Sequence, residues 1–496
     1  MNLVFLFFIL QSCIQLSDNK TITLGIENFP DGLDPSINNS IYEVKIFSQI
    51  YETLIKIDKD HKTLIPNLAK NWLVSDDDKC FTFTLQEGIR FHDGSFLSAS
   101  DVEFSFRRYM EKNKSSILTE YVDSVYTVDS MTVNVKLRDQ YFQFLYSLTS
   151  PLIFVIMSEK AVKKYGEEIA WNPIGTGPYQ LKSWKENDLI ELKSFETYRQ
   201  QTNEVKYIKF KLLPDDSRVE MALQNEEVDV LYMVSGYLLD RLQWKGRINY
   251  FVQPATSTVY IGFNNKELPF NDIRIRRAIL KALNLPKLVL NLSRGNAILA
   301  EGPLPPALYE YKNDKQLGYN IGEAKSLIIQ AGYENGLTVK CYIPEVGISR
   351  HTIIQMLKSE LDKIDINLDV RLYDTWEAHD LAIKSDSSQM FIDAYDSDIL
   401  GDAHYFLYSL FHSKSKTNSL HYSNPNIDHW LDRASRESDY NARKKLYDTI
   451  VKQILNDTPA IFLFHVIPHF AYNRDKIKVL AADPYHIIQF HQIILQ

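Results

Sequence analysis

Cysteine is scarce in this sequence, with only Cys13, Cys80 and Cys341 among 496 residues. Three cysteines can form neither a disulfide framework nor a four-cysteine zinc site. Glycine and proline number 18 each, which excludes a collagen-like or low-complexity chain. Beyond the N-terminal segment the sequence has no apolar run of the length that a transmembrane helix needs, so no internal segment is expected to span a membrane.

Positive charge is also in short supply, because 55 Lys and Arg residues face 63 Asp and Glu residues and give a formal net charge of −8. Binding to a phosphate backbone needs a basic surface, so we expect no nucleic-acid partner. Hydrophobic residues make up 45% of the chain, as is typical of a globular protein. At roughly 100–200 residues per domain, the length corresponds to about three structural units.

The sequence motifs of common catalysts are absent. The chain has no G-x-x-x-x-G-K-[ST] phosphate loop, no G-x-S-x-G nucleophile turn and no H-E-x-x-H zinc helix. Gly175-Thr176-Gly177 lacks the third glycine of a dinucleotide-binding fingerprint and is interpreted as a structural turn. The twelve histidines are scattered and are expected to be structural, although a minor metal role for His404 and His412 stays open. We therefore expect no enzyme activity, no cofactor and no metal site.

The N-terminal segment has the pattern of an export signal, since residues 1–10 are almost purely apolar and the chain turns polar soon after Cys13. The segment Leu10–Cys13 resembles a loose bacterial lipobox, whose cysteine is lipidated and becomes the mature N-terminus. Gln11 is unusual in that motif, and no Lys or Arg precedes the apolar run. We expect residues 1–19 to be a lipoprotein signal peptide and tether. The alternative is an uncleaved buried strand in which Cys13 is incidental.

Strand-like and helix-like hydrophobic patterns alternate along the chain. Period-two alternation predicts strands at Lys20–Ile26, Phe81–Phe91, Met131–Leu137, Tyr207–Leu213 and Thr258–Asn264. Helical patterns are found at Ile41–Ile55, from Ser100 onward, and at Asn271–Leu283, Tyr319–Ala331, His351–Lys363 and Ala442–Leu455. This alternation indicates an α/β fold. No linker rich in glycine or serine occurs, so ordinary strands are expected to form the hinge between packed lobes.

Several sequence blocks occur in the order that one protein family shows. These blocks are Leu33–Pro35, Ile50–Leu54, Pro66–Trp72, Phe81–Gly94, Ala99–Arg107, Ile174–Tyr179, Pro269–Ala278 and Tyr319–Tyr333. With them the chain resembles, from about Ile22 to about Pro468, the bacterial extracellular solute-binding proteins of the oligopeptide- and dipeptide-binding type. Those proteins are the capture subunits of ABC importers.

The resemblance implies an α/β, two-lobed periplasmic-binding-protein-like fold of three domains, with a ligand cleft between the lobes. The first lobe is expected from three separate segments, 20–50, 175–259 and 473–496. An extra domain, 51–174, is inserted in it, and the second lobe spans 260–472. The lobes are expected to close around the ligand, and the protein is expected to be a monomer.

The resemblance also points to an acidic residue that meets the ligand. In peptide-binding members, an aspartate in a segment of the form W--D---P--F pairs with the free amine of the peptide. Here Tyr395 replaces the tryptophan, Ala403 replaces the proline, and one residue is inserted. Counting from Tyr395 puts Asp398 in the amine-binding place, with Asp396 and Asp402 as rival candidates.

A second ligand-binding stretch is implied near the N-terminus. Ser40, Ile41 and Tyr42 match the family segment whose backbone pairs with the peptide in the first lobe. Strand-like pairing binds a peptide backbone and ignores its side chains, whereas a charge-assisted bond to the amine fixes the register. Together these contacts suit ligands of varied sequence.

The implied function is the capture of peptides outside the cytoplasm and their delivery to the permease and ATPase subunits of an ABC transporter. The expected location is the periplasm or cell surface, with the protein anchored to the bacterial membrane as a lipoprotein through Cys13. Within the same fold the ligand could instead be a nickel chelate, haem or an oligosaccharide. The competing class is an exported hydrolase, which the missing nucleophile motifs disfavour.

Overall fold

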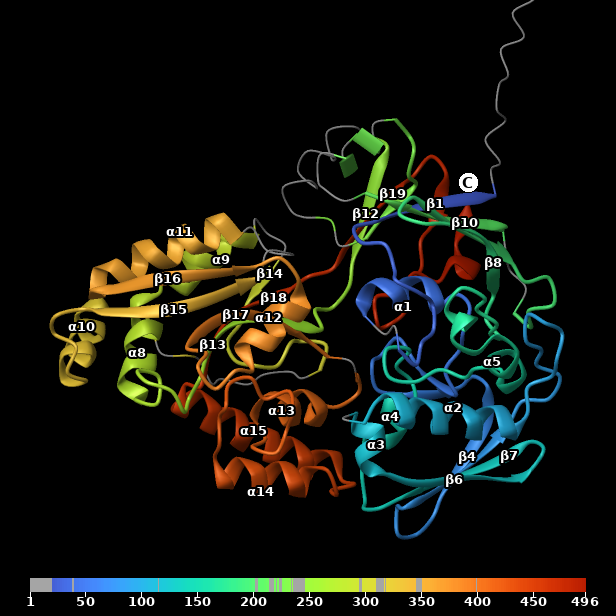
Figure 1. Ribbon diagram of the computed structural model, residues 1–496, viewed down its shortest axis with the longest axis horizontal. Coiled ribbons are helices and arrows are strands. Elements are labelled where there is room, and N and C mark those ends of the chain that lie inside the picture. The colour runs from blue at the N-terminus through green and yellow to red at the C-terminus, as the bar shows by residue number, and fades with distance from the viewer. Residues whose placement is uncertain are drawn as a thin grey trace, which may run out of the picture.

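The computed structural model describes residues 20–37, 40–114, 116–200, 204–213, 218–219, 221–222, 225–232, 234, 246–293, 297–308, 316, 318–344, 350–397 and 399–496. These residues form two lobes that lie side by side along the longest axis (Figure 1). Each lobe combines a mixed β-sheet with helices. The α/β, two-lobed architecture expected from the sequence is confirmed.

The first lobe is built on a seven-stranded sheet. Its strands in spatial order are β12 (Ile248–Val252), β19 (His469–Asn473), β11 (Val230–Leu231), β1 (Thr21–Ile26), β10 (Tyr207–Leu212), β9 (Leu189–Ser194) and β8 (Tyr179–Lys185). Strand β1 runs parallel to both of its neighbours, β10 and β11, and the other neighbouring pairs are antiparallel. The sheet therefore collects strands from distant parts of the chain.

The core of the first lobe follows from the alternation in β1. Ile22 and Leu24 are buried on one face of the strand and share a hydrophobic core with Val44 and Phe47 of helix α1 (Ile41–Phe47). The C-terminal segment returns to the same core. Its elements are β20 (Ile477–Val479), η3 (Phe490–Gln492) and β21 (Ile494–Leu495).

Helix α1 is shorter than the predicted segment 41–55. The chain leaves the helix because the backbone beyond Phe47 bonds to the turn that precedes β8. The carbonyl of Gln49 accepts the N–H of Tyr179 at 3.0 Å, and the carbonyl of Ile50 accepts the N–H of Gly177 at 2.8 Å. Apolar spacing alone does not reveal such a distant partner.

Between β1 and β8 the chain forms a smaller unit around an antiparallel four-stranded sheet. The sheet order is β4 (Ala69–Val74), β5 (Cys80–Leu85), β7 (Thr132–Leu137) and β6 (Val122–Asp129), and a separate hairpin joins β2 (Ile55–Ile57) to β3 (Leu64–Pro66). The helices are α2 (Ala99–Lys112), α3 (Ile117–Tyr121), α4 (Phe144–Ser147), α5 (Glu159–Tyr165) and the 3₁₀ turn η1 (Gly166–Ala170). Helix α2 begins at Ala99, before the predicted start at Ser100, because its N-cap Ser98 forms a capping box with Asp101.

The second lobe is built on a six-stranded sheet. Its order is β14 (Ala297–Leu299), β18 (Ala460–Val466), β13 (Ser257–Phe263), β17 (Met390–Asp396), β15 (Leu337–Pro344) and β16 (Ile366–Tyr373). The helices are α8 (Ile273–Ala282), α9 (Leu285–Ser293), α10 (Ile321–Gln330), α11 (Arg350–Leu361), η2 (Asp362–Ile364), α12 (Trp376–Ile383), α13 (His404–Phe411), α14 (Pro425–Ala434) and α15 (Tyr440–Asp457). Within the described residues, no helix is both long and apolar enough to cross a membrane.

Helices cover both faces of this second sheet, and β13 shows why. Val259, Ile261 and Phe263 point to the core shared with α8 to α11, whereas Tyr260 points to the core shared with α13 to α15. Every residue of β13 is buried, as expected for a strand covered on both faces.

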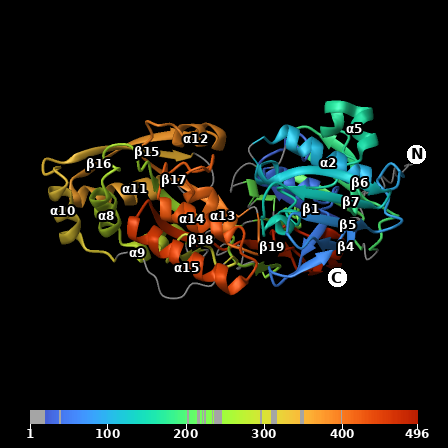
Figure 2. The same ribbon diagram turned by 90° about the horizontal axis from the view of Figure 1, so that it is seen from below.

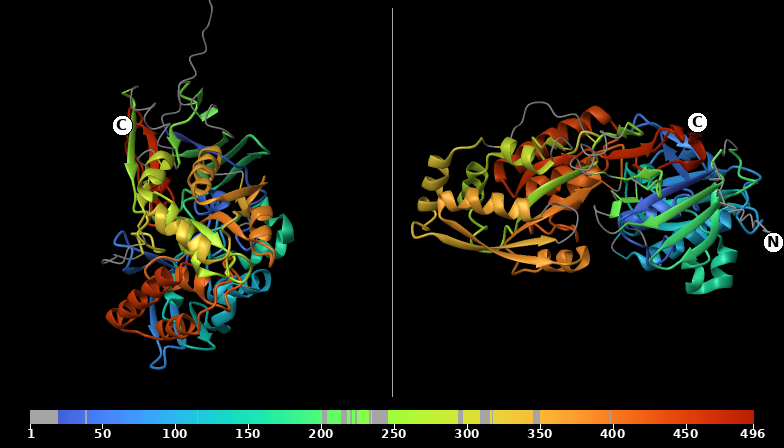
Figure 3. Two further views of the ribbon diagram at one scale, coloured as in Figure 1. Left: turned by 90° about the vertical axis from the view of Figure 1, so that its left-hand side faces the viewer. Right: turned by 90° about the horizontal axis from the view of Figure 1, so that it is seen from above.

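Two chain connections join the lobes, one between β12 and β13 and one between β18 and β19. The view from below and the view from above keep the two lobes apart on either side of these connections (Figure 2 and the right panel of Figure 3). Strand β13 begins at Ser257 and β19 at His469, so each joins its sheet a few residues before the expected boundaries at 260 and 473. The assignment of three domains to these segments stays a prediction.

Candidate functional site

Helix α1 begins with three of the residues that the sequence singled out. Ser40 is the exposed N-cap, and its hydroxyl accepts the N–H of Tyr42 at 3.3 Å and donates to the carboxylate of Glu43. Ile41 is the first residue of the helix. Burial raises the pKa of the Tyr42 phenol, and the negative charge of Glu27 adds to this rise. The predicted segment therefore lies at a helix N-terminus among acidic side chains.

Lys45 lies one turn further along α1. Its ammonium nitrogen lies 3.7 Å from the ring centroid of Tyr232, the residue after β11, and 5.5 Å from that of Tyr42. Burial lowers the pKa of Lys45 to about 8, and the charge of Glu27 partly opposes this effect. The sequence did not predict this residue, because nothing in the pattern of α1 reveals its contact with Tyr232.

The second lobe contributes the end of strand β17. Tyr395 is half-buried and packs edge to face on Phe406, with ring centroids 5.0 Å apart. Asp396 ends the strand opposite Ser257 of β13 and is exposed to solvent. Protein atoms around it nevertheless displace much of its hydration, and this desolvation raises the pKa of its carboxyl group. An exposed carboxylate in such surroundings is suited to meet a cation.

Charges of the two lobes act on one another at this place. Burial raises the pKa of Tyr232 on the first lobe, and the negative charge of Asp396 on the second lobe adds to this rise. Glu377 of α12 acts in the same way, though weakly, on Tyr42. We call Tyr42, Lys45, Tyr232, Glu377 and Asp396 the inter-lobe cluster.

Carboxylates outnumber cations around the inter-lobe cluster. Among the residues that the structure describes, Glu27 and Glu43 of the first lobe add to Glu377 and Asp396 of the second, and Lys45 belongs to the same cluster as a cation. Burial raises the pKa of Glu43, and the charge of Asp31 adds to the rise. The arrangement therefore favours a ligand with a cationic group.

Asp402 lies apart from this cluster in a closed hydrogen-bond network. Its carboxylate is fully buried and accepts bonds from Arg443 Nε at 2.9 Å, Gln143 Nε2 at 2.9 Å, the N–H of His404 at 3.0 Å and the hydroxyl of Tyr447. Gln143 belongs to the unit around the four-stranded sheet, so Asp402 joins this unit to the second lobe. All of its acceptor capacity in this structure is used within the protein.

Two of the predicted site residues lie outside the described residues. They are Asp398, the first choice for binding the amine, and Cys13, the proposed lipidation site. The structure thus brings Tyr42 and Asp396 into one cluster, leaves Asp402 in another place, and adds Lys45, Tyr232 and Glu377. The added residues carry no motif that the sequence could have revealed.

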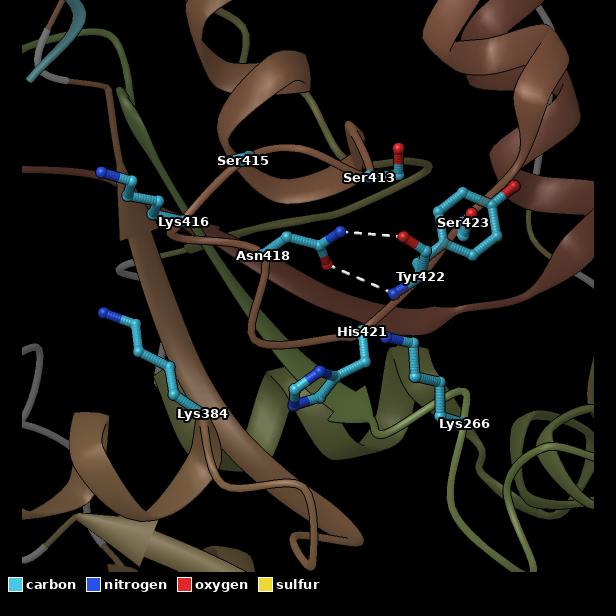
Figure 4. A pocket seen from close by; sticks show the side chains of 9 residues that line it. All are labelled: Lys266, Lys384, Ser413, Ser415, Lys416, Asn418, His421, Tyr422 and Ser423. Carbon is cyan, nitrogen blue, oxygen red and sulfur yellow. Dashed lines mark hydrogen bonds between the residues drawn. The ribbon is translucent and has the colours of Figure 1, made fainter. Parts of the chain in front are cut away.

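A polar cavity of about 270 Å³ lies elsewhere on the second lobe. Figure 4 shows Lys384 and Lys416 on one side of it and Lys266 on the other, with the ring of His421 between Lys384 and Lys266. Strand β13 begins at Ser257, the partner of Asp396, and ends at Phe263, shortly before Lys266. The cavity is therefore at the far end of this strand from Asp396 and is not part of the inter-lobe cluster.

A second cavity, of about 210 Å³, lies within the first lobe. The acidic groups that line it are occupied by protein donors. Glu52 accepts two hydrogen bonds from Arg199 at 2.7 and 2.8 Å, and Asp483 accepts the N–H groups of Tyr485 and Ile487 at 3.0 Å. The Asp483 contacts fix the turn at residues 483–487 of the C-terminal segment.

The histidines for which a metal role stayed open have protein partners. His404 donates through Nε2 to the carbonyl of Leu431 at 3.1 Å, and His412 Nε2 lies 3.3 Å from a carboxylate oxygen of Asp432. No group of three or more potential ligands that could hold a metal ion is found in the part of the chain that the structure describes.

Comparison with known proteins relates this arrangement to one family. Residues 63–418 match the family model described as "Bacterial extracellular solute-binding proteins, family 5 Middle". The glutathione-binding protein GsiB of Pectobacterium atrosepticum is 27% identical over 456 residues, which are 90% of this chain and 88% of that protein.

Solved structures share the fold at lower identity. The periplasmic binding protein DppA of Helicobacter pylori, in complex with the peptide STSA, superposes with a TM-score of 0.86 at 22% identity over 96% of this chain and 98% of its own. NikZ of Campylobacter jejuni, in complex with Ni(L-His), gives a TM-score of 0.81 at 23% identity over 95% and 98% of the two chains.

Proposed function

Because the chain belongs to family 5 of the bacterial extracellular solute-binding proteins and is therefore a binding subunit of an ABC importer and not an enzyme, we propose that it captures short peptides between its two lobes. The observation that carries this proposal is the surplus of carboxylates among the described residues around the inter-lobe cluster, one of which, Asp396, is exposed and has a pKa raised by desolvation. A peptide amine needs such an acceptor when water is excluded.

The roles of the predicted residues follow from this proposal. Asp398 or Asp396 binds the peptide amine, and Tyr395, which packs on Phe406, contributes an aromatic wall. Asp402 is the third candidate from the sequence. Four protein donors bond to its carboxylate, so this residue stabilises the protein and does not meet the ligand.

The first lobe is proposed to bind the peptide backbone. Ser40, Ile41 and Tyr42 form the start of α1, where the first N–H groups of a helix have no backbone partner within it. An extended peptide that lies along this segment gains main-chain hydrogen bonds that do not depend on its side chains. Such binding accommodates ligands of varied sequence.

A nickel chelate is a second candidate ligand with an observation in its favour, because NikZ shares this fold and its structure holds Ni(L-His). The likeness is one of fold, and the described residues offer no group of ligands for a bare metal ion. A nickel–histidine complex carries its own donor atoms and is therefore included as a probe in the thermal-shift test. Haem and oligosaccharides stay open as ligand classes for the same fold.

Members of this family act outside the cytoplasm. We propose that Cys13 is lipidated, that it anchors the protein at the bacterial membrane in the periplasm or at the cell surface, and that the monomeric protein delivers peptides to a permease with its ATPase subunits. The apolar run that ends near Cys13 supports the anchor. Cys13→Ala is expected to release the protein from the membrane fraction, and retention with unchanged mass would contradict the anchor.

A thermal-shift panel tests the ligand class. The probes are the peptide STSA, glutathione and nickel–histidine, each at concentrations up to the millimolar range. A ligand present at about one hundred times its Kd stabilises the folded state by about 2.7 kcal/mol, which is readily seen as a rise in Tm. We expect a rise with STSA or glutathione, and a rise with nickel–histidine alone would replace the peptide proposal.

A further inference from the structure

The polar cavity of about 270 Å³ on the second lobe is basic. Among the described residues that line it, Lys266, Lys384 and Lys416 carry positive charge and none carries a carboxylate. The chain as a whole is acidic, with a formal net charge of −8. Three lysines around one hollow therefore create a local potential that is opposite in sign to the net charge of the molecule.

The three lysines come from separate parts of the chain. Lys384 is the C-cap of α12, Lys266 lies shortly after β13, and Lys416 lies in the loop between α13 and α14. Figure 4 shows Lys384 and Lys416 on one side of the cavity and Lys266 on the other. Tertiary folding thus allows their ammonium groups to approach one ligand from opposite sides.

Most of this positive charge is not compensated by the protein. Asp380 pairs with Lys384 at 2.6 Å, so one of the three charges has a partner. For the exposed ammonium group of Lys266, the part of the chain that the structure describes supplies neither a hydrogen-bond acceptor nor a carboxylate within 4.0 Å. A ligand with more than one negative charge would complement the cavity.

The loop that forms one wall of the cavity is held in place by its own polar side chains. Asn418 Nδ2 donates to the carbonyl of Tyr422 at 2.8 Å, and Asn418 Oδ1 accepts the N–H of Tyr422 at 3.3 Å (Figure 4). The hydroxyl of Ser413 donates to the carboxylate of Asp428 at 2.6 Å. Because these bonds fix the wall, a ligand binds without the cost of ordering the loop.

His421 adds a polar atom that lacks a partner. Its ring lies between Lys384 and Lys266 (Figure 4), and its Nε2 atom is buried and has no hydrogen-bond partner among the described residues. Such a group is uncommon in a folded protein. A ligand with acceptor oxygens would supply the missing partner when Nε2 carries the proton.

We propose that this cavity binds a phosphate group. A phosphate group carries up to about two negative charges and acceptor oxygens that point in several directions, so it can meet lysines on opposite sides, which bind phosphate as point charges. The site is independent of peptide capture, because it lies at the far end of β13 from Asp396. The group can belong to a soluble phosphate or to the head group of a lipid.

Equilibrium dialysis of the full-length protein against radiolabelled inorganic phosphate tests the proposal. We expect saturable binding of one phosphate per chain that weakens as sodium chloride is added. Lys266→Met and Lys416→Met should each lower the affinity roughly tenfold, because each removes a charged donor. Both lysines are exposed, so the fold should tolerate either substitution.

Lys363→Met is the matched control. Lys363 lies on the same lobe but outside the cavity, where it pairs with Glu360 at 2.6 Å. The variant changes the net charge by the same amount and should bind phosphate as the wild type does. All of these variants should bind STSA with wild-type affinity, which separates this site from peptide capture.

Vesicles distinguish the two sources of the group. The full-length protein is sedimented with phosphatidylcholine vesicles, with and without phosphatidic acid. A preference for phosphatidic acid that is lost in Lys266→Met/Lys416→Met and kept in Lys363→Met assigns the cavity to a lipid head group. Phosphate binding in dialysis without this preference assigns it to soluble phosphate. The proposal is overturned when the wild type shows neither effect, or when the double variant matches the wild type in both measurements.

Discussion

At the scale of single residues, two carboxylates of one short segment differ in their surroundings. Asp396 is exposed at the end of β17 and has a raised pKa because protein atoms displace its water. Asp402 is fully buried and accepts four hydrogen bonds, one of them from the cation Arg443. The charge of Asp402 is therefore compensated within the protein, whereas Asp396 is exposed and accepts a hydrogen bond from the hydroxyl of Ser257.

Asp402→Asn is expected to destabilise the protein strongly. The substitution keeps the shape but leaves the buried guanidinium of Arg443 without its carboxylate, which typically costs about 3–5 kcal/mol. The control is Asp139→Asn, which removes an exposed pair with Arg436 at 2.8 Å and should cost less than about 1 kcal/mol. Urea unfolding of both variants checks this, and equal midpoints would contradict the structural role of Asp402.

Removing the amine-binding charge is expected to weaken peptide binding. The double variant Asp396→Asn/Asp398→Asn should lose roughly a hundredfold or more in affinity for STSA, because the ammonium group of the bound peptide loses its carboxylate partner. It should also lose the preference for STSA over N-acetylated STSA. Calorimetry on the two single variants then identifies the aspartate. Wild-type affinity in the double variant would mean that neither residue meets an amine.

At the scale of elements, the turn at residues 174–179 fixes where α1 ends. A side chain on Gly175 would bring its Cβ to within 2.0 Å of the carbonyl oxygen of Ile50, and one on Gly177 would lie 2.6 Å from that of Gln49. Both glycines are therefore required for the close approach of two backbones. This bears out the interpretation of the segment as a structural turn.

Gly175→Ala is accordingly expected to lower the stability of the protein. The added methyl group forces the backbones apart, and overpacking of this kind costs typically about 1–3 kcal/mol. Gly318→Ala is the control, since a Cβ at Gly318 meets no atom within 4 Å. Thermal unfolding should show a lower Tm for Gly175→Ala alone, and an unchanged Tm would contradict the close approach.

The elements also show how far a sequence can be interpreted. Local periodicity predicted β1, β7, β10 and β13 closely, because their alternation is a property of each strand by itself. It made α1 too long, because the end of α1 depends on hydrogen bonds to Gly177 and Tyr179. The family resemblance supplied the two-lobed fold, but it could not reveal Lys45 beside Tyr232, since these residues meet only through tertiary packing.

At the scale of the whole molecule, the two lobes are joined in two ways. Two short strand connections link the sheets. The unit around the four-stranded sheet also bonds to the second lobe, through Gln143 to the buried Asp402 and through the N–H of Phe142 to the carbonyl of Ser435 at 2.8 Å. The inter-lobe cluster is assembled from both lobes, so its geometry depends on how far they close.

The central claim is that a peptide is captured between the lobes, and small-angle X-ray scattering during a titration with STSA tests it most directly. Binding that closes the two lobes around one ligand should lower the radius of gyration, and the change should saturate at one peptide per chain. The scattering of the empty protein should correspond to a monomer. Peptide binding measured by calorimetry, with no change in the radius of gyration, would contradict capture by closure of the two lobes.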